Sequence, residues 1–567
     1  MCSRLQARYP EMCVGSTLTQ NKILQLDSRD NVLIALADLN QGELVQFRDK
    51  SCTVASNIGA KHKLATEDLV AGADVIMYGV LVGKASKAIR RGEMLSTTNV
   101  QHAAAVFHED RAEYRWQAPD VSRWTQRTFL GYQRSDGQVG TRNYWLVVPL
   151  VFCENRNIGV LKQAFEEELG FAAPQLYRRQ VAALAKLYRD GQLEESRISS
   201  LSEPVAAPPP VPTFENVDGI KFLLHESGCG GTREDSDNLC GLIAGYIHHP
   251  NVAGATVLSL GCQHAQTGIL RQQIRKRNPH FDKPLFILEQ QQSRSEFVML
   301  CEAIQKTFLG LVEANKAKRA PAALSRLCVG LKCGGSDGFS GISANPAIGH
   351  TADLLVALGG RTILSEFPEL CGVEQELINR SVSKEVSSRF VRLVRDYEAR
   401  ARAVGSGFEM NPSPGNMRDG LITDAMKSAG AAKKGGKSPV TAVLDYPEYA
   451  VVPGLNLQCT PGNDVECVTA QVGAGANVVL FTTGLGTPTG NPIAPVVKIA
   501  SNTSLSQRMS DIIDVDTGGI ISGEATIEHT GERILDAVIA VASGEMRTKA
   551  ELKGQNDFIP WKRGVSL

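Results

Sequence analysis

The stretch Leu331-Lys332-Cys333-Gly334-Gly335-Ser336-Asp337-Gly338-Phe339-Ser340-Gly341-Ile342-Ser343-Ala344-Asn345-Pro346 follows directly on an apolar run. It sets a thiol, a carboxylate, hydroxyls and an amide among glycines. Glycine allows backbone conformations closed to other residues, so amide groups can turn inward and approach an anion or a hydroxyl closely. The stretch therefore indicates a polar ligand site at the end of a strand, with a surface turn as the alternative interpretation.

The same order of strand, polar turn and helix recurs earlier in the chain. Apolar runs at 144–151, 221–224, 255–260 and 285–288 are typical of buried strands. Gly228-Cys229-Gly230 follows the second run and Gly261-Cys262-Gln263 follows the third. This order predicts an α/β fold with mostly parallel sheets, in which ligands bind at the carboxyl ends of the strands.

The 567 residues are enough for about three or four domains of roughly 150 residues. Short β-type runs separated by turns predict a small β-rich domain at 22–102, after a leader at 1–21. A polar segment with two tryptophans, 103–127, is expected to be an ordered surface connector. We predict a second α/β domain at 128–320 and a C-terminal α/β domain at 321–567. A basic, helix-prone piece and a Pro/Ala-rich tail at about 172–213 form an insertion.

Composition excludes several classes of protein. Lys plus Arg and Asp plus Glu both number 60, so no overall field attracts nucleic acid or an anionic membrane. No apolar run approaches the roughly 20 residues of a membrane helix, and no secretory signal is evident. Thirteen cysteines without a CxxC pair are typical of reduced thiols. We expect a cytoplasmic enzyme with no nucleic-acid or membrane partner.

Six longer motifs carry a resemblance to a known family. They are Gly131-Tyr132-Gln133-Arg134-Ser135-Asp136-Gly137-Gln138-Val139-Gly140-Thr141-Arg142-Asn143, the Cys333 turn, Ser365-Glu366-Phe367-Pro368-Glu369, Asn411-Pro412-Ser413-Pro414-Gly415-Asn416, Thr460-Pro461-Gly462-Asn463-Asp464, and Thr482-Thr483-Gly484-Leu485-Gly486-Thr487-Pro488-Thr489-Gly490-Asn491-Pro492. Through these motifs the chain from about Lys22 to Leu567, except for the insertion, resembles the altronate and galactarate dehydratases.

The resemblance implies an N-terminal domain of the SAF type and a hydro-lyase reaction. That reaction is loss of water from D-altronate to give 2-dehydro-3-deoxy-D-gluconate, aided by Fe²⁺ or another divalent metal such as Mn²⁺. Galactarate or another sugar acid is the alternative substrate, and a non-catalytic sugar-acid-binding protein is the alternative function. We also expect a homo-oligomer, and a β domain that closes over the strand ends as a lid.

Removal of a proton beside a carboxylate concentrates negative charge, which a divalent cation can stabilise. Glu366 and Glu369 come just after the predicted strand 362–364 and are candidate metal ligands, unless they are an acidic pair that complements a helix dipole. Cys229, Cys262 and Cys333 lie beside glycine-rich turns and are the candidate thiol ligands. The same three cysteines could instead supply thiolates to an iron–sulfur cluster.

Three residues are candidate bases. His62 lies between Lys61 and Lys63, which would depress its pKa, and the resemblance favours it; a solvated basic turn is the alternative. His225 ends a predicted strand just before the Gly228-Cys229-Gly230 turn; a structural role, which is the commoner one for a lone histidine, is the alternative. Lys498 lies on the strand-like run 496–499, where desolvation could lower its pKa unless it is an exposed edge residue. Relatives often carry several histidines where this chain has Gly92-Glu93-Met94-Leu95-Ser96-Thr97-Thr98-Asn99.

Substrate hydroxyls and the carboxylate need hydrogen-bond donors and acceptors. The candidates, each of which could also be a turn or cap residue, are Arg142, Ser336, Asp337, Asn416, Asn463, Asp464 and Thr483. Gly484 and Gly486 resemble part of a dinucleotide fingerprint, but Pro488 breaks the helix start that such a site requires. No redox cofactor is therefore expected.

Overall fold

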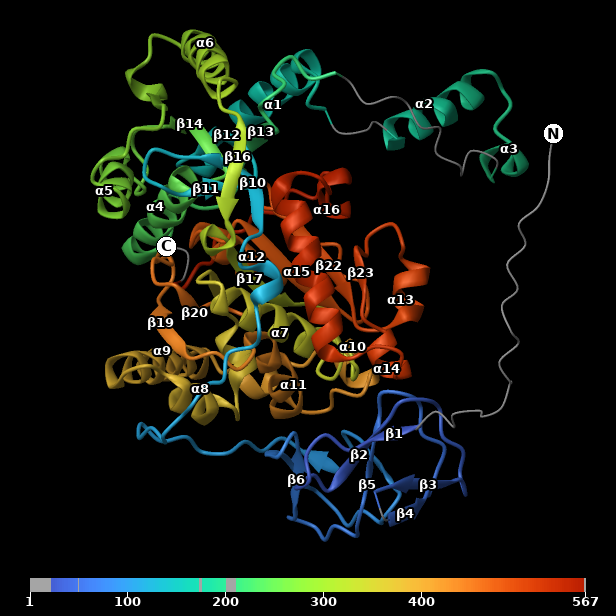
Figure 1. Cartoon of the computed structure of the whole chain (residues 1–567). Helices are drawn as coiled ribbons and strands as arrows, with labels where there is room; N and C mark the ends of the chain where they lie inside the picture. Colours follow the sequence, from blue (N-terminus) through green and yellow to red (C-terminus); the bar gives the residue numbers. More distant parts are fainter. Residues whose placement is uncertain (1–21, 49, 173–175, 200–210, 565–567) are drawn as a thin grey trace, which may run out of the picture.

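The computed structural model describes residues 22–48, 50–172, 176–199 and 211–564. The predicted leader and most of the Pro/Ala-rich tail of the insertion lie outside these residues. A small β domain is followed by two α/β domains whose main sheets are parallel (Figure 1), which confirms the predicted fold class. No helix in the described part of the chain has the length and apolar character needed to cross a bilayer.

The N-terminal domain consists of short strands that pair in antiparallel fashion. The apolar run 75–83 is divided between two strands, because Tyr78 and Gly79 both adopt positive φ and turn the chain back on itself. The three sheets have the orders β1-β2-β5-β8, β3-β4 and β6-β7-β9. Their strands are β1 Ile23–Leu24, β2 Val32–Ala35, β3 Leu44–Phe47, β4 Lys50–Thr53, β5 Lys63–Ala65, β6 Asp74–Met77, β7 Val80–Ala85, β8 Met94–Leu95 and β9 Val100–Gln101.

The second domain has a parallel sheet in the order β13-β12-β14-β15. Its strands are β12 Tyr144–Pro149, β13 Gly219–Phe222, β14 Val252–Ser259 and β15 Leu285–Glu289. Helices α1 Asn155–Leu169 and α6 Glu296–Ala314 cover one face, and α4 Arg233–His248 and α5 Thr267–Arg277 cover the other. The insertion forms α2 Leu176–Arg189 and α3 Glu195–Ser199, which extend away from the body of the molecule (Figure 1).

The C-terminal domain is built on seven parallel strands in the order β19-β20-β18-β17-β21-β22-β23. They are β17 Cys328–Cys333, β18 Arg361–Leu364, β19 Val440–Leu444, β20 Gly454–Gln458, β21 Val478–Thr483, β22 Val496–Ala500 and β23 Val515–Asp516. From β17 the chain first runs to β18 on one side and later returns to β21 on the other. Such a reversal of strand order opens a crevice at the carboxyl ends of the strands, where ligands bind in open α/β sheets.

Helices pack on both faces of this sheet. They are α7 Ala344–Ala357, α8 Glu374–Arg380, α9 Lys384–Ala403, α10 Pro414–Arg418, α11 Asp424–Ala431, α12 Asp464–Gly473, α13 Thr503–Arg508, α14 Gly519–Ser522, α15 Ile527–Ser543 and α16 Lys549–Leu552. One apolar core contains Val148 of β12 and Phe481 of β21, so the two α/β domains share it.

A second link between these domains is an antiparallel sheet. In it β10 Thr128–Gln133 pairs with β11 Val139–Gly140 and with β16 Arg319–Ala323. The domain boundary expected at 320/321 therefore falls inside a strand. Because β10 and β16 come from the two ends of the predicted second domain, their pairing closes that domain against the C-terminal one.

Candidate active site

A cavity of about 370 Å³ lies at the carboxyl end of β17, in the crevice where the strand order reverses. The sequence segments that meet there are far apart along the chain. The lining residues are Cys333, Gly334, Gly335, Ser336, Glu369, Asn411, Ser413, Asn416, Lys427, Gly462, Asn463, Asp464 and Leu485. Five of the six motifs quoted above contribute to this wall, so the turn after β17 is a ligand-site candidate rather than an exposed loop.

Three lysines and three carboxylates interlock beside this cavity. Lys332 hydrogen-bonds to one carboxylate oxygen of Glu366, and Lys434 Nζ lies 2.5 Å from the other. Lys427 Nζ lies 2.9 Å from Oε1 of Glu369. Lys332 Nζ also lies 3.1 Å from Oδ1 of Asp464. The ammonium and carboxylate groups therefore balance one another at the wall of the cavity.

Glu366, which binds two of these lysines, has a strained backbone conformation. Its φ of 69° and ψ of 57° place a non-glycine residue in the left-handed region, directly after β18. Such a strained backbone persists only where contacts with the surrounding structure hold it in place, and it is frequent at functional sites. Here the turn directs the buried carboxylate of Glu366 towards Lys332 and Lys434.

Glu369, like Asp464, reaches the cavity wall. Burial acts to raise its pKa, but the attraction of Lys427, and then of Lys332 and Lys434, outweighs burial and lowers the pKa to about 2. The carboxylate is therefore ionised throughout the physiological pH range. Lys427 is held in turn by Asn411, whose Oδ1 lies 2.5 Å from Nζ.

Cys333 is a buried neutral thiol at the back of the cavity. Burial raises its pKa to about 12, although Lys434 opposes that shift. Its sulfur accepts a hydrogen bond from Lys434 Nζ at 2.7 Å, and the thiol donates to Oε2 of Glu369 at 3.4 Å. The sulfur thus joins the two carboxylate–lysine pairs.

The arrangement of Cys333, Glu366 and Glu369 bears on the expected metal. Their ligand atoms lie within 4.8 Å of one another, a spacing that a metal ion could bridge. However, the ammonium of Lys434 already lies within hydrogen-bond distance of the Cys333 sulfur and of Glu366. A divalent ion between these ligand atoms would be repelled by the nearby ammonium groups of Lys332 and Lys434. These side chains, as the fold arranges them, therefore do not fit a divalent metal.

Four of the predicted substrate-binding residues do line the cavity. Asn463 caps α12 by accepting hydrogen bonds from the backbone N–H groups of Val465 and Glu466. Asn416 donates to the carbonyl oxygen of Ser336 at 2.7 Å, which ties α10 to the glycine turn. A Cβ at Gly334 would lie 2.4 Å from Oδ1 of Asp464, so the turn approaches Asp464 closely only because residue 334 is glycine.

The side chains of Asp337 and Thr483 form hydrogen bonds within the protein. Asp337 is fully buried and accepts hydrogen bonds from Ser340 and Ser501, so it organises the glycine turn and is not a substrate ligand. Thr483 Oγ1 accepts from the backbone N–H groups of Gly486 and Thr487 at 2.9 and 3.1 Å. Its hydroxyl therefore shapes the loop after β21 instead of pointing to a ligand.

The β domain contacts the C-terminal domain beside the cavity. Lys61 Nζ lies 3.1 Å from Asp337 and 2.9 Å from Asp419, and Lys63 donates to the carbonyl oxygen of Gly420 at 2.7 Å. His62, between them, is half-buried, and burial followed by the charge of Lys63 lowers its pKa. His62 does not line the cavity itself, but this loop brings it next to α10.

The contacts of Arg142 and His225 contradict the roles predicted for these two residues. Arg142 is buried in a two-point ion pair with Glu551, at 2.7 and 3.0 Å, which leaves it no access to substrate. His225 donates from Nε2 to the carbonyl oxygen of Pro149 at 2.8 Å and accepts at Nδ1 from Ser227 N–H. Burial lowers the pKa of His225 to about 4, so it is a neutral structural residue and not the base.

The remaining predicted residues also lie outside the cavity. Lys498 is fully buried, its Nζ 3.6 Å from the ring centre of Phe481, and burial lowers its pKa to about 7. Cys229 and Cys262 are exposed on turns of the second domain. In the described part of the chain only Cys333 belongs to a group with metal-ligand spacing, so Cys229, Cys262 and Cys333 do not form a three-cysteine cluster.

The three lysines of this network were not predicted from the sequence. Lys332 could have been identified, because it is a charged residue in the otherwise apolar strand β17. Lys427 on α11 and Lys434 in the short 3₁₀ helix Ala432–Gly435 could not, because lysines on helices are usually solvated. All three point to Glu366 or Glu369 only after the chain has folded.

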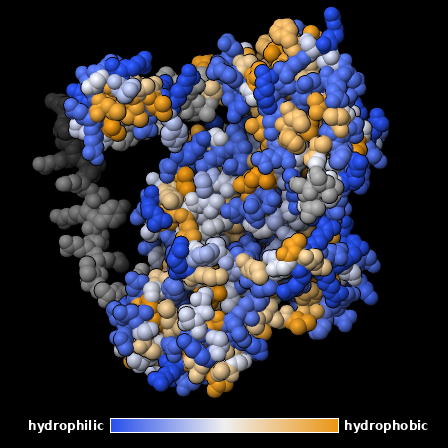
Figure 2. Space-filling model, turned by 180° about the vertical axis from the view of Figure 1, so that it is seen from behind, coloured by the Kyte–Doolittle hydropathy of each residue, from blue (hydrophilic) through white to orange (hydrophobic). Residues whose placement is uncertain are grey.

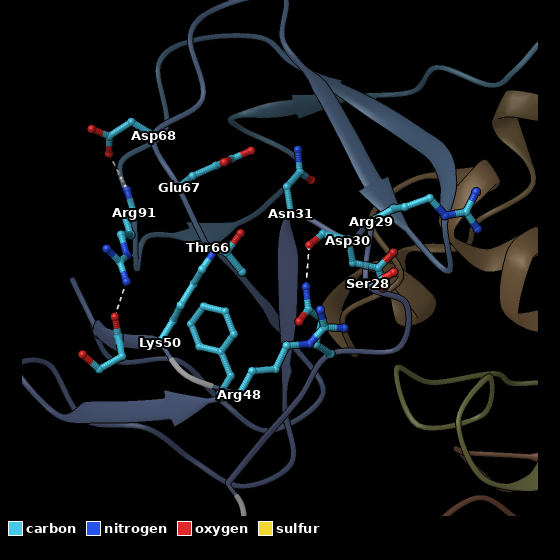
Figure 3. Close-up of a pocket in the computed structure, with 13 residues that line it drawn as sticks. Ser28, Arg29, Asp30, Asn31, Arg48, Lys50, Thr66, Glu67, Asp68 and Arg91 are labelled. Atoms are coloured by element: carbon cyan, nitrogen blue, oxygen red, sulfur yellow. Dashed lines mark hydrogen bonds between the residues drawn. The ribbon is translucent and has the colours of Figure 1, made fainter.

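A larger hollow of about 850 Å³ lies on the β domain. Both acidic and basic side chains line it (Figure 3), and the backbone N–H of Arg91 donates to Asp68 at 2.7 Å. Every residue of its wall belongs to the β domain, and none lies at the carboxyl end of a parallel strand. The smaller cavity is therefore the better candidate for the chemistry.

Comparison with protein families gives three consecutive matches. Residues 21–103 match the altronate/galactarate dehydratase SAF domain, which confirms the predicted type of the N-terminal domain. Residues 131–315 match the second domain of D-galactarate dehydratase/altronate hydrolase. Residues 324–566 match the C-terminal domain of D-galactarate/altronate dehydratase.

Curated proteins resemble the chain over nearly its whole length. Altronate dehydratase of Bacillus subtilis (strain 168) is 33% identical over 545 residues, which cover 96% of this chain and 99% of that protein. Altronate dehydratase of Escherichia coli (strain K12) is 32% identical over 548 residues, with the same coverage of 96% and 99%. Galactarate dehydratase (L-threo-forming) of the same bacterium is 29% identical over 538 residues, or 94% of each chain.

Proposed function

Since the chain belongs to the altronate and galactarate dehydratase family and is a hydro-lyase, we propose that it removes water from D-altronate to give 2-dehydro-3-deoxy-D-gluconate. The single observation that best supports this proposal is the cavity at the end of β17. It brings carboxylates, an ammonium and amide side chains to one wall, beside the glycine turn. These are the groups that an acid with several hydroxyls requires.

The electrostatics of the cavity suit an enediolate. Loss of the C2 proton places a second negative charge beside the substrate carboxylate. Lys427 lines the cavity and Lys332 and Lys434 stand directly behind it, so their ammonium groups can offset that charge. Charged groups held in place before the reaction stabilise such a transition state without reorganisation, and this is often the largest contribution to catalysis.

Glu369 is the best-placed base. It is ionised, it lines the cavity, and Lys427 and Cys333 hold it in place. In our proposal its carboxylate takes the C2 proton, and the resulting carboxylic acid returns that proton to the C3 hydroxyl as the C3–O bond breaks. The proton and the hydroxyl leave together as water, so one group serves both steps when both bonds lie on the same face of the substrate. The low pKa makes Glu369 a weak base, and the lysines must therefore carry much of the barrier reduction.

Recognition of the sugar chain falls to the amide and hydroxyl residues of the cavity wall. Asn411, Ser413 and Asn463 line it beside the glycine turn. Altronate and galactarate differ at the far end of the chain, where galactarate carries a second carboxylate. An additional cation at the mouth of the cavity would favour galactarate. All three lysines of the network instead gather at the Glu366–Glu369 end, which favours an acid with one carboxylate.

A panel of sugar acids tests the proposal. The purified protein is assayed with D-altronate, galactarate and other hexonates, and the 2-keto-3-deoxy product is measured. We expect the highest kcat/KM for D-altronate. Release of product from galactarate alone would reassign the substrate, and ligand binding without turnover would favour the non-catalytic sugar-acid-binding alternative. The cytoplasmic location stays a prediction, and so does a dependence on Fe²⁺ or Mn²⁺, which would need ligands other than the Cys333–Glu366–Glu369 group.

A further inference from the structure

Three exposed cysteines lie at one edge of the second domain. Cys153 follows β12, Cys229 follows β13 and Cys262 follows β14, and all three are free thiols. The strands are parallel neighbours in the order β13-β12-β14, so their carboxyl ends meet at the same edge of the sheet, about 4.8 Å from one strand to the next. We call these three residues the thiol triad. None of them lines the active-site cavity.

The turns that carry the thiol triad contact one another through the backbone. The N–H of Phe152 donates to the carbonyl oxygen of Ser227 at 3.1 Å, which joins the turn after β12 to the turn after β13. The N–H of Ala265 donates to the carbonyl oxygen of Gly228 at 3.1 Å, which joins the turn after β14 to the same place. A Cβ at Gly228 would lie 2.1 Å from the carbonyl oxygen of Leu150, so this close approach requires glycine. The three turns are therefore held together beside the thiols.

Two polar side chains next to the thiol triad have atoms without a partner. Glu154 follows Cys153 and is 1% exposed. Its Oε2 accepts from Asn157 at 2.8 Å, but its Oε1 has no hydrogen-bond partner among the described residues. Nδ1 of His264, two residues after Cys262, is likewise covered and without a partner in that part of the chain. Such atoms are costly to bury unpaired, and carboxylate and imidazole are both ligands of iron.

The spacing of the thiols favours a cluster over a single ion. Among the described residues, Cys333, Glu366 and Glu369 form the only group of three such ligands whose atoms lie within 4.8 Å of one another. The thiol triad therefore does not surround one ion as it is folded. In an iron–sulfur cluster each thiolate binds a different iron atom, and sulfide ions between the irons hold the thiolates farther apart. Three thiolates leave one iron of a four-iron cluster to another ligand.

We propose that the thiol triad binds a [4Fe–4S] cluster, with Glu154 and His264 beside the iron that no cysteine holds. Each thiol gives up its proton on binding, and each thiolate takes one iron. The sequence indicated Cys333 as the third thiol of such a cluster, but Cys333 is buried in the C-terminal domain, where it contacts Lys434 and Glu369. Cys153 takes its place, because β12 lies between β13 and β14.

The thiol edge is open to solvent. Helix α1 begins at Asn155, beside Cys153, and its 15 residues run about 22 Å to the other end, after which the insertion follows. In Figure 2 the insertion is the separate block at the upper left, apart from the body of the molecule. The insertion therefore leaves the thiol triad uncovered, and iron can reach it. Because exposed thiols oxidise, the experiments below exclude oxygen.

Variants of the full-length protein, made in iron-rich medium and purified without oxygen, test the site. The wild type should show the broad visible absorption of sulfide-to-iron charge transfer, with about four iron and four sulfide ions per chain. Cys153→Ser, Cys229→Ser and Cys262→Ser should each lose most of the absorption and most of the iron. Cys301→Ser, on α6, is the matched control and should keep both. Far-UV circular dichroism shows that each variant is folded.

Several results would overturn the proposal. One is a wild type that holds no iron and sulfide, both as purified and after incubation with ferric iron, sulfide and a thiol reductant. A single zinc or iron ion per chain without sulfide would do the same. So would triad variants that keep the visible absorption, or its loss in Cys333→Ser instead. These measurements use no sugar acid, so their outcome is separate from the assignment of D-altronate as the substrate.

Thiol labelling provides a second readout that needs no variant. In protein freed of iron with a chelator, iodoacetamide should alkylate all three cysteines of the triad, and dibromobimane should cross-link two of them. In the iron-loaded protein their alkylation should be at least about tenfold slower, because a thiolate bound to iron is not free to attack. The partly exposed Cys301 should react at the same rate in both. Equal labelling of the triad with and without iron, or no cross-link within it, would contradict the proposal.

Discussion

Lys434 Nζ lies 2.7 Å from the sulfur of Cys333 and so holds the position that a cation between Cys333 and Glu366 would take. The lysine brings positive charge to this place without a metal ion. It also keeps the thiol hydrogen-bonded while burial raises the pKa of Cys333 to about 12.

Cys333→Ser should leave the metal content of the protein unchanged. The lysines already satisfy the side chains of the Cys333–Glu366–Glu369 group, so iron loaded under anaerobic conditions is not expected to bind there. Metal per chain after desalting is measured by mass spectrometry, with the partly exposed Cys301→Ser as the control. A loss of one iron per chain in Cys333→Ser alone would show that the group is a metal site.

Glu369→Gln should lower kcat by about 10²–10⁴-fold, the usual contribution of a general base or acid. The amide keeps the shape of the side chain but cannot take the C2 proton. Steady-state kinetics with D-altronate measures the loss, and calorimetric binding of substrate shows that the cavity remains formed. Glu398→Gln, on the exposed pair with Arg402, is the control. An unchanged kcat in Glu369→Gln would remove Glu369 from the mechanism.

Lys61→Met should loosen the β domain from the C-terminal domain. The substitution leaves the buried Asp337 without its cation, which should cost about 1–3 kcal/mol. We expect faster hydrogen exchange in the Lys61–Lys63 loop and a lower kcat/KM. Lys84→Met removes an exposed pair with Asp74 and should do neither. Unchanged exchange in Lys61→Met would mean that the ion pair does not hold the two domains together.

Arg142→Met should destabilise the protein by about 3–5 kcal/mol without changing KM, because it leaves Glu551 as a buried, unpaired carboxylate. Replacing both partners, in Arg142→Met with Glu551→Met, should recover much of the stability. Urea unfolding and steady-state kinetics measure the two effects. A large rise in KM with unchanged stability would instead return Arg142 to substrate binding.

Three buried histidines should make the protein sensitive to acid. Burial lowers the pKa of His225 and of His248 to about 4, and that of His249 to about 3, all below the usual value near 6.5. A depressed pKa contributes stability that is present above the pKa of the unfolded chain and is lost as pH falls towards the folded value. The free energy of unfolding should therefore decrease between about pH 6.5 and pH 4.

Urea unfolding at several pH values measures that decrease. His225→Gln should make the pH dependence of the unfolding free energy shallower, because one fewer group takes up a proton on unfolding. The pH–rate profile should keep its shape, since His225 contacts the Pro149 carbonyl and not the cavity. A profile that loses one limb in His225→Gln would identify His225 as the base after all.

Much of the site could be predicted from local patterns. The turn after β17, the pair Glu366 and Glu369, and the caps Asn416 and Asn463 all come from short motifs beside strands or helix starts. Their backbone geometry is set by neighbouring residues, and parallel strands bring their carboxyl ends together. The roles predicted for Arg142 and His225 were wrong, because the sequence around each residue resembles that around a ligand-binding residue. Their partners, Glu551 and the Pro149 carbonyl, come from elsewhere in the chain.

The family, the α/β class and the glycine turn at Cys333 can be identified from the order of residues along the chain, because strand patterns, turn residues and long motifs are properties of neighbouring residues. Which charges meet depends instead on how distant segments pack. Lys332, Lys427 and Lys434 come from a strand, a helix and a 3₁₀ turn, and they reach Glu366 and Glu369 through packing between segments 34 to 68 residues apart. An ionisable group acquires its role from what surrounds it after burial, and no local pattern contains that information.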